Sequence, residues 1–366
     1  MISFHLKGFT MQNLNPHNTS IDFSRPSSER RVVLTYKNFP VAHHVSHIGL
    51  GVSALNTAKV LRQNGIHADV WPILGAKDLA ARIAATNPKP SHIVIGAPWI
   101  PTLDLQAFLI FRFPDIEFSV VCHSNVGFLS ADPTAIKNFR EELNLEQGAL
   151  NFTAAGNSKR FVKFIEDSYQ RPCRWLPNLY FLDNSAPVYR RAWTGGLLKI
   201  GCFGAVRPLK NTLSAAAASL EIAERLNTNV DFHISVGRVE GGYTVVRAVE
   251  AALNGSPRVT LVKDDWYQWS NFRHVIRSMN LLMQPSFSET FNMVTADGAA
   301  ELIPSVVSDA IDWAPDDWKA EVDSPNDIAR IGRRLLFDQD AGADGFWALK
   351  RHNADGLAAW KLWLQV

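Results

Sequence analysis

The sequence has 366 residues, of which 46% are apolar and 20% are charged, and its formal net charge is +2. This composition excludes a disordered chain, and the length predicts two domains of roughly 150 to 200 residues. A run of roughly 18 apolar residues, which a membrane-spanning helix needs, does not occur. The first ten residues lack a cationic region followed by an apolar one, so no secretory signal is predicted.

Charge is distributed unevenly along the chain. Residues 1–190 carry 19 Lys and Arg against 14 Asp and Glu, whereas residues 191–366 carry 18 against 21. The basic first half is compatible with an acidic partner, such as nucleic acid or an anionic membrane surface, and equally with ordinary variation of surface charge.

The cysteines indicate a reducing compartment. Cys122, Cys173 and Cys202 are odd in number and show no C-x-x-C spacing. Neither a disulfide framework nor a zinc site is therefore expected, and we predict a cytoplasmic protein.

Along residues 1–190 a polar start gives way to alternating strand and helix patterns. The first thirty residues predict a loop or a peripheral hairpin. Apolar runs of strand length then follow at 31–36, 68–74, 92–96, 118–122, 152–155 and 173–176. Helical spacing of apolar residues occurs at 51–63, 103–112, 134–145 and 158–169.

The alternation stops at Thr194-Gly195-Gly196, which predicts a domain junction, and then resumes. Strands are predicted at 198–203, 231–236, 258–262, 280–283 and 305–308. Helices are predicted at 213–226, 243–253, 270–278 and 291–302. The tail from Gly345 onward has helical spacing and contains three tryptophans, so we expect it to pack back on a domain.

Strands that alternate with helices indicate parallel sheets covered on both faces. We therefore predict an α/β fold with two facing, doubly wound, Rossmann-like domains. The predicted parts are a first domain at 1–190, a second at 191–345, and a C-terminal helix at 346–366 that returns to the first domain. Doubly wound sheets bind ligands at the carboxyl ends of their strands, so the loops that follow strands are the candidate site.

Two loops carry features that suit a phosphate. Gly49 and Gly51 precede a predicted helix, where glycine lets the backbone approach an anion or simply makes a tight turn. Arg207 and Lys210 stand where the 213–226 helix begins. The helix dipole disfavours cations there, so they indicate a bound anion, unless both side chains are solvated.

Polar residues also follow two other strands. His123 comes directly after the 118–122 strand and suits a contact with a ligand hydroxyl or a loop carbonyl. Glu289 and Asp297 are eight residues apart, so on one continuous helix they would project from nearly the same face. The helix start after Glu289 also predicts an anion site.

Two further groups remain open. His43, His44 and His47 form a cluster, but no carboxylate or cysteine stands at ligand spacing beside them, so no metal site is predicted. Trp266 follows the 258–262 strand and suits either stacking on a nucleobase or core packing.

Together these residues resemble glycosyltransferase family 4, a retaining, nucleotide-sugar-dependent group with the GT-B fold. The family carries a segment of the type Pro-Ser-x-x-Glu-x-Phe-Gly, with a second Glu eight residues after the first. Pro285, Ser286, Glu289 and Phe291 match it, while Asn292 replaces the Gly and Asp297 replaces the second Glu. The resemblance implies that Glu289 contacts the donor sugar and that Asp297 contacts the ribose.

The resemblance also covers the phosphate loop. Lys210 matches the family's lysine, whereas Ala205 occupies the family's arginine position and Arg207 stands two residues later. It further implies that His123 meets the sugar's 6-hydroxyl and that Gly49 and Gly51 lie near the diphosphate. The implied set of donor-binding residues is completed by Asn211, Thr290, Phe291, Asn292 and Met293.

The implied activity is retaining transfer of a hexosyl group from a nucleotide diphosphate sugar, UDP-glucose or similar, to a hydroxyl acceptor. Neither a metal nor another cofactor is expected. The acceptor stays open between DNA and a soluble or lipid-linked glycan; some phage enzymes with a similar loop glycosylate 5-hydroxymethyl pyrimidines in DNA. Other interpretations are a nucleotide-sugar epimerase, a sugar phosphorylase, or an inactive module that only binds a nucleotide sugar.

Overall fold

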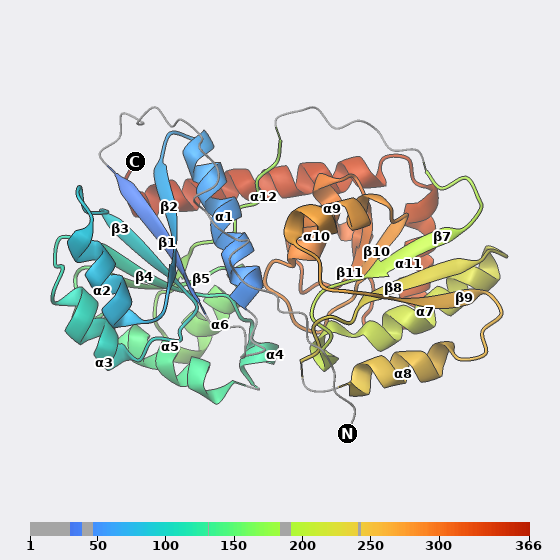
Figure 1. Ribbon diagram of the computed structural model, residues 1–366, viewed down its shortest axis with the longest axis horizontal. Coiled ribbons are helices and arrows are strands. Elements are labelled where there is room, and N and C mark those ends of the chain that lie inside the picture. The colour runs from blue at the N-terminus through green and yellow to red at the C-terminus, as the bar shows by residue number, and fades with distance from the viewer. Residues whose placement is uncertain (1–29, 39–46, 131, 184–191, 241–242) are drawn as a thin grey trace, which may run out of the picture.

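The computed structural model describes residues 30–38, 47–130, 132–183, 192–240 and 243–366. These residues form two α/β units side by side, each built on one parallel sheet (Figure 1). The hairpin or loop predicted in the first thirty residues lies almost wholly outside the described residues. Among the described helices, none is long and apolar enough to cross a membrane.

The first unit contains a six-stranded sheet with the order β2-β1-β3-β4-β5-β6. Its strands are β1 (Arg31–Lys37), β2 (His67–Ile73), β3 (His92–Gly96), β4 (Glu117–Cys122), β5 (Phe152–Gly156) and β6 (Arg174–Trp175). All pair in parallel; Val32, for example, lies between Ala68 and His92. Buried apolar residues fill most positions of β1, β3, β4 and β5, as expected for parallel strands that are covered on both faces.

Helices cover both faces of this sheet. They are α1 (His47–Gln63), α2 (Ala76–Ala85), α3 (Thr102–Asp104) with the π-helix η3 (Leu105–Ile110), α4 (Val126–Leu129), α5 (Pro133–Leu145) and α6 (Lys159–Tyr169). One core packs α2 and η3 against Ile93 and Ile95. The core on the opposite face packs α1 against Val32 and Leu34.

The second unit contains a five-stranded parallel sheet with the order β11-β10-β7-β8-β9. Its strands are β7 (Leu198–Cys202), β8 (Val230–Ser235), β9 (Val259–Asp264), β10 (Leu281–Gln284) and β11 (Ser305–Val307). Its helices are η4 (Pro208–Lys210), α7 (Thr212–Arg225), α8 (Thr244–Leu253), α9 (Trp269–Arg277), α10 (Met293–Ala300), η5 (Asp316–Trp318) and α11 (Pro325–Phe337). The strand order reverses between β7 and β10, which makes this the topological switch point of the sheet.

The last helix, α12 (Ala341–Leu364), extends across both units (Figure 1). Ala348 and Leu349 belong to the core of the second unit. Trp360 and Trp363 belong to a core of the first. A helix of this length spans roughly 36 Å, enough to bridge two small domains. Trp360 and Trp363 therefore pack on the first unit, as predicted for the tail, whereas Trp347 is 43% exposed.

The same helix packs against residues 177–180, which belong to the segment that connects the two units between β6 and β7. The side chain of Asn353 donates a hydrogen bond of 2.6 Å to the Tyr180 carbonyl and accepts one of 2.9 Å from the Tyr180 amide. The indole of Trp360 donates to the Pro177 carbonyl over 2.9 Å. A Cβ added at Gly356 would lie 2.6 Å from Leu179, so glycine permits this close approach. The connecting segment and α12 are thus packed together.

Candidate functional site

The candidate site lies at the switch point between β7 and β10, where two loops leave the carboxyl ends of the strands. The loops are residues 203–211 and 285–292. The amide of Phe287 donates to the Leu209 carbonyl over 2.9 Å, and the side chain of Asn211 donates to the Pro285 carbonyl over 3.0 Å. These bonds fix the two loops against each other.

Lys210 and Glu289 meet across these loops in an ion pair. Their side chains are only 14% and 9% exposed. Gly204 faces the lysine: a Cβ there would lie 3.7 Å from Lys210 Cε. Its φ of +110° also favours glycine. The structure therefore brings together the cation and the carboxylate that the sequence placed after different strands.

Arg207 is held by a carboxylate that the sequence analysis missed. Its Nη1 lies 3.2 Å from Glu240 Oε2, and Nη2 of Arg238 lies 2.8 Å from Glu240 Oε1. The Arg207 guanidinium also stacks on Phe128 of the first unit, 5.0 Å from the ring centroid. Its Nε is buried without a hydrogen-bond partner. The cations near the start of α7 are thus balanced by Glu240 and Glu289. No sequence signal links Glu240 to this loop.

The first unit contributes the segment that follows β4. Thr290 donates its hydroxyl proton to the His123 carbonyl over 3.2 Å, and the Asn125 side chain donates to the Glu289 carbonyl over 3.1 Å. His123 is half-buried, and burial lowers the pKa of its ring to about 4. His123 therefore stands beside the Glu289 loop as a neutral imidazole at neutral pH. In Figure 1, α4 lies at the junction of the two units.

Glu289 and Asp297 do not share one helix, which corrects the geometry expected from their spacing. The helix α10 begins at Met293, whereas the sequence predicted a start at 291. Asn292 is its N-cap, with Oδ1 accepting from the Thr295 amide over 2.9 Å. The left-handed φ of +59° at Asn292 breaks the helical geometry, so Glu289 stays in the loop.

Asp297 lies in the interior, 2% exposed. Its Oδ1 accepts hydrogen bonds from the Tyr180 hydroxyl at 2.6 Å and from the Trp269 indole at 2.9 Å. Burial raises the pKa of the carboxyl to about 6, although both donors favour the charged form. The expected contact with a ribose stays a prediction.

Several members of the implied donor-binding set hold the loops in place. Phe291 is buried beside Trp313 and His352, and its carbonyl accepts from the Trp313 indole over 2.6 Å. Asn211 is buried and also donates to the Val322 carbonyl over 2.9 Å. Met293 is half-buried at the start of α10.

The glycines near residue 50 do not form a loop, which is a second correction. The helix α1 begins at His47, so Gly49 and Gly51 lie in its first turns. Gly51 is buried against Tyr36, where an added Cβ would lie 3.3 Å from the ring. Close packing of α1 on β1 explains this glycine, while Gly49 is exposed near the helix N-terminus.

Other candidates lie apart from this pair or outside the description. His43 and His44 lie outside the described residues. In the described part of the chain, no group of three His, Cys, Asp or Glu side chains is arranged to hold a metal ion. Trp266 stacks under the Arg238 guanidinium, 5.5 Å from the ring centroid. Cys122, Cys173 and Cys202 are buried free thiols.

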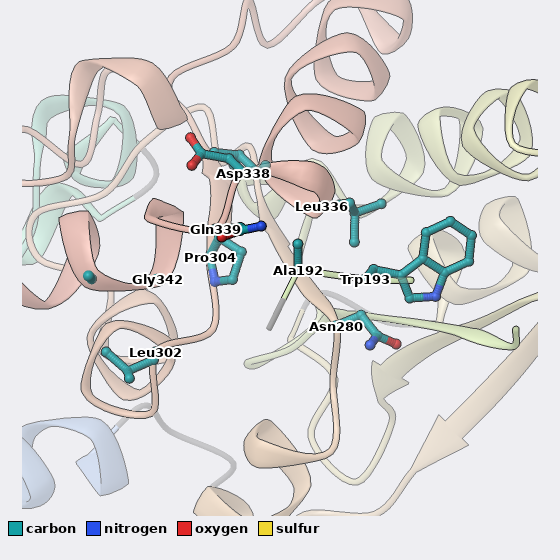
Figure 2. Close-up of a pocket in the computed structure, with 11 residues that line it drawn as sticks. Ala192, Trp193, Asn280, Leu302, Pro304, Leu336, Asp338, Gln339 and Gly342 are labelled. Atoms are coloured by element: carbon teal, nitrogen blue, oxygen red, sulfur yellow. The ribbon is translucent and has the colours of Figure 1, made fainter. Parts of the chain in front are cut away.

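A small pocket lies at the opposite end of the second sheet (Figure 2). Asn280 and Pro304, which directly precede β10 and β11, line it together with Trp193 and Leu336. It therefore opens at the amino ends of the strands. The loops that carry Lys210 and Glu289 leave the carboxyl ends, so the pocket is not part of the candidate site.

No protein-family model matches the sequence, and no curated protein sequence matches it. Solved structures do match the fold. TarM from S. aureus, a mutant in complex with Fondaparinux, alpha-GlcNAc-glycerol and UDP, has a TM-score of 0.56 at 14% identity; the match covers 75% of this chain and 55% of TarM. The chain thus matches about half of TarM's length.

Other matches cover nearly the whole of both chains. HepE from Anabaena, in complex with UDP and glucose, has a TM-score of 0.56 at 13% identity, covering 90% of this chain and 95% of HepE. OtsA has a TM-score of 0.60 at 9% identity, covering 91% and 98%. These structures are GT-B proteins, so the predicted fold of two Rossmann-like domains is confirmed.

Proposed function

We propose that the protein transfers a hexosyl group, with retention, from a nucleotide diphosphate sugar to a hydroxyl acceptor. The observation that carries this proposal is the Lys210–Glu289 pair at the switch point, on a loop whose Thr290 bonds to His123 of the other unit. UDP, or UDP with glucose, accompanies TarM and HepE, and a similar synthase from Burkholderia xenovorans is UDP-forming. These relatives favour a UDP-linked hexose such as UDP-glucose as the donor.

In this proposal the cationic side chains of the second unit bind the diphosphate. An ammonium group has three N–H donors, so Lys210 can keep its bond to Glu289 and still donate to a phosphate. The unpartnered Nε of Arg207 supplies a second donor. The first amides of α10 and the N-terminus of α1 at Gly49 supply helix-terminus charge. Fixed donors of this kind contribute about 3 kcal/mol each to transition-state stabilisation.

The sugar is assigned to Glu289 and His123, with Thr290 between them. Glu289 is fixed by Lys210, which suits it to hold sugar hydroxyls rather than to attack the anomeric carbon. We therefore infer attack from the face that the diphosphate leaves. The bond from the anomeric carbon to the diphosphate oxygen breaks, the acceptor oxygen bonds to that carbon, and the acceptor's proton passes to the diphosphate.

The ribose contact assigned to Asp297 has one structural condition. Because its Oδ1 already accepts two hydrogen bonds, the ligand would need Oδ2 or would have to displace a donor. No metal is required in this scheme, since Lys210, Arg207 and helix termini supply the positive charge. We therefore expect the enzyme to keep its activity in the presence of EDTA.

The test is a panel of nucleotide sugars incubated with hydroxymethylated DNA and with small glycans, with products identified by mass spectrometry. Transfer predicts a mass gain of one hexosyl unit on one acceptor class, UDP release only when that acceptor is present, and retained anomeric configuration by NMR. UDP-sugar conversion without acceptor would indicate epimerisation instead. Donor binding without turnover on any acceptor would indicate a binding module.

The matched variants are Lys210→Ala and Lys137→Ala. Removing the lysine at the switch point should lower turnover by about 100-fold or more, as loss of a fixed charge donor does. Lys137 is an exposed lysine on α5, its side chain 74% exposed, and its variant should keep normal turnover. Unchanged turnover in Lys210→Ala would remove the phosphate role.

A further inference from the structure

A chain of hydrogen bonds joins His123 to the second unit through Asn157. The Thr290 hydroxyl donates to the His123 carbonyl over 3.2 Å. Nδ2 of Asn157 donates to Thr290 Oγ1 over 3.1 Å and lies 3.3 Å from His123 Nδ1. Asn157 directly follows β5, whereas Thr290 follows β10, so the chain crosses the interface between the units.

The direction of each bond in this chain is fixed by chemistry. A carbonyl oxygen only accepts, so the single hydroxyl proton of Thr290 is committed to His123. Thr290 Oγ1 must then accept from Asn157, which requires the amide NH₂ on that side. The second proton of that NH₂ points to His123 Nδ1, which accepts. A neutral imidazole that accepts at Nδ1 carries its proton on Nε2.

Asn157 is held in this position by a backbone hydrogen bond and by the burial of its side chain. The backbone amide of Asn157 donates to the Cys122 carbonyl over 3.1 Å, which extends the hydrogen-bond ladder between β4 and β5. Its side chain is buried, and Oδ1 has no hydrogen-bond partner. An unpartnered buried acceptor costs about 1–3 kcal/mol, so the residue is poorly explained as a purely structural one.

The opposite end of the imidazole, Nε2, lies beside Gly96 of β3. A Cβ added at Gly96 would lie 3.9 Å from His123 Nε2 and 2.9 Å from the Thr35 carbonyl. Because Gly96 has no side chain, no Cβ lies at this position beside Nε2. The proton on Nε2 is therefore placed at the carboxyl end of the first sheet, where doubly wound folds bind ligands.

We propose that Asn157 is a positioning residue which, through Thr290 of the second unit, fixes His123 as the Nε2–H tautomer. The fixed proton is then donated from Nε2 to an oxygen of the bound ligand. Only the ligand's identity, a sugar hydroxyl, rests on the proposed function; the tautomer is a property of the free protein. Separation of the two units would break the Thr290 bonds and release this constraint.

The test is ¹⁵N NMR of the imidazole nitrogens in the full chain, labelled at histidine, without ligand, near neutral pH. The His123 signals are assigned by their loss in His123→Gln. We expect an imine-type shift for Nδ1 and a pyrrole-type shift for Nε2. His352 provides an internal reference, because its Nε2 lies 3.0 Å from the Asn178 carbonyl, which only accepts and therefore requires Nε2–H.

Three variants test the route of the constraint. Asn157→Asp replaces the donor with a carboxylate, so His123 should gain a proton on Nδ1 and titrate at higher pH. Thr290→Val should give averaged tautomer shifts, whereas Thr290→Ser keeps the hydroxyl and should restore the wild-type pattern. Asn144→Asp adds the same charge at an exposed position and should leave the His123 signals unchanged.

A wild-type Nδ1–H signal, or unchanged His123 signals in Asn157→Asp, would overturn the proposal. The outcome is independent of turnover. If the tautomer pattern holds while no sugar is transferred, the proposed function fails and the positioning role stands. If transfer occurs without the pattern, the positioning role fails alone. With an active acceptor, Asn157→Asp should lower kcat more than it changes KM for the donor.

Discussion

The hydroxyl of Tyr180 donates a hydrogen bond of 2.6 Å to Oδ1 of Asp297, which lies 117 residues later in the chain. Tyr180 belongs to the segment that connects the two units, and its backbone is bonded on both sides to Asn353 of α12. Asp297 belongs to α10, whose N-terminus faces the candidate site. The connecting segment, the last helix and the site helix therefore meet at one buried carboxyl group.

Asp297 should make stability depend on pH. Its pKa is raised from 3.8 to about 6 in the folded state, so between these values the folded protein holds a proton that the unfolded chain releases. The contribution of Asp297 to the unfolding free energy should therefore fall as pH rises from roughly 4 to 6, by on the order of 3 kcal/mol. Urea unfolding across this range measures it.

Asp297→Asn is the matched control for this titration. The amide oxygen can still accept from Tyr180 and Trp269, but it has no proton to lose in this range. The unfolding free energy of the wild type minus that of the variant should therefore decrease as pH rises. Tyr180→Phe removes a donor to the charged form and should move the titration to higher pH. A difference that stays flat with pH would contradict the assigned pKa.

The Lys210–Glu289 pair should show a large coupling energy because both side chains are mostly buried. The losses of stability caused by Lys210→Met alone and by Glu289→Gln alone should add up to more than the loss in the double variant. We expect a coupling on the order of 2 kcal/mol in a double-mutant cycle of unfolding free energies. The Lys263–Glu250 pair, with side chains 45% and 40% exposed, should give less than about 1 kcal/mol.

Gly127 should control how closely the two units approach. A Cβ at this position would lie 2.8 Å from Ser288 Cβ in the opposite loop. Gly127→Ala should therefore keep donor binding, measured by calorimetry, while turnover falls by about 100-fold, the loss that a misplacement of roughly 1 Å causes. Adding Ser288→Gly should restore turnover.

The control for this prediction is Gly148→Ala. Gly148 is exposed, and its added Cβ would meet only the Leu145 carbonyl at 3.9 Å, an ordinary contact. Its activity should equal that of the wild type. Equal turnover in Gly127→Ala and Gly148→Ala would show that closure at Gly127 has no role in catalysis.

Trp360 should anchor α12 to the first unit. It is 2% exposed and donates to the Pro177 carbonyl. Trp360→Ala should cost about 3–5 kcal/mol, the usual loss for a buried tryptophan. Hydrogen exchange should report faster opening at β1 and α1, against which the helix packs. Leu362→Ala on the same helix, 73% exposed, should change stability by less than about 0.5 kcal/mol.

Strand positions were predictable because parallel strands are buried on both faces and appear as short apolar runs. The predicted run at 92–96 is β3 without a shift, and the other strands differ by one residue at one or both ends, except that β9 ends two residues later than predicted. Among the longer described helices α2 and α11 were missed, and the four-residue helix α4 was missed as well. The two longer helices carried signals: α2 buries Leu79 and Ile83 at helical spacing, and α11 begins with Ser324 as N-cap and Pro325.

The sequence by itself determined which loops form the candidate site, because Lys210, Glu289 and His123 each follow a strand, and the parallel strands of each sheet end at one edge. Only the tertiary structure decided their partners. Glu240 on Arg207, Asn157 on His123 and Tyr180 on Asp297 are contacts between residues at least 33 positions apart. Local spacing contains no information about such pairs, since they form only when the sheets, α12 and the connecting segment pack together.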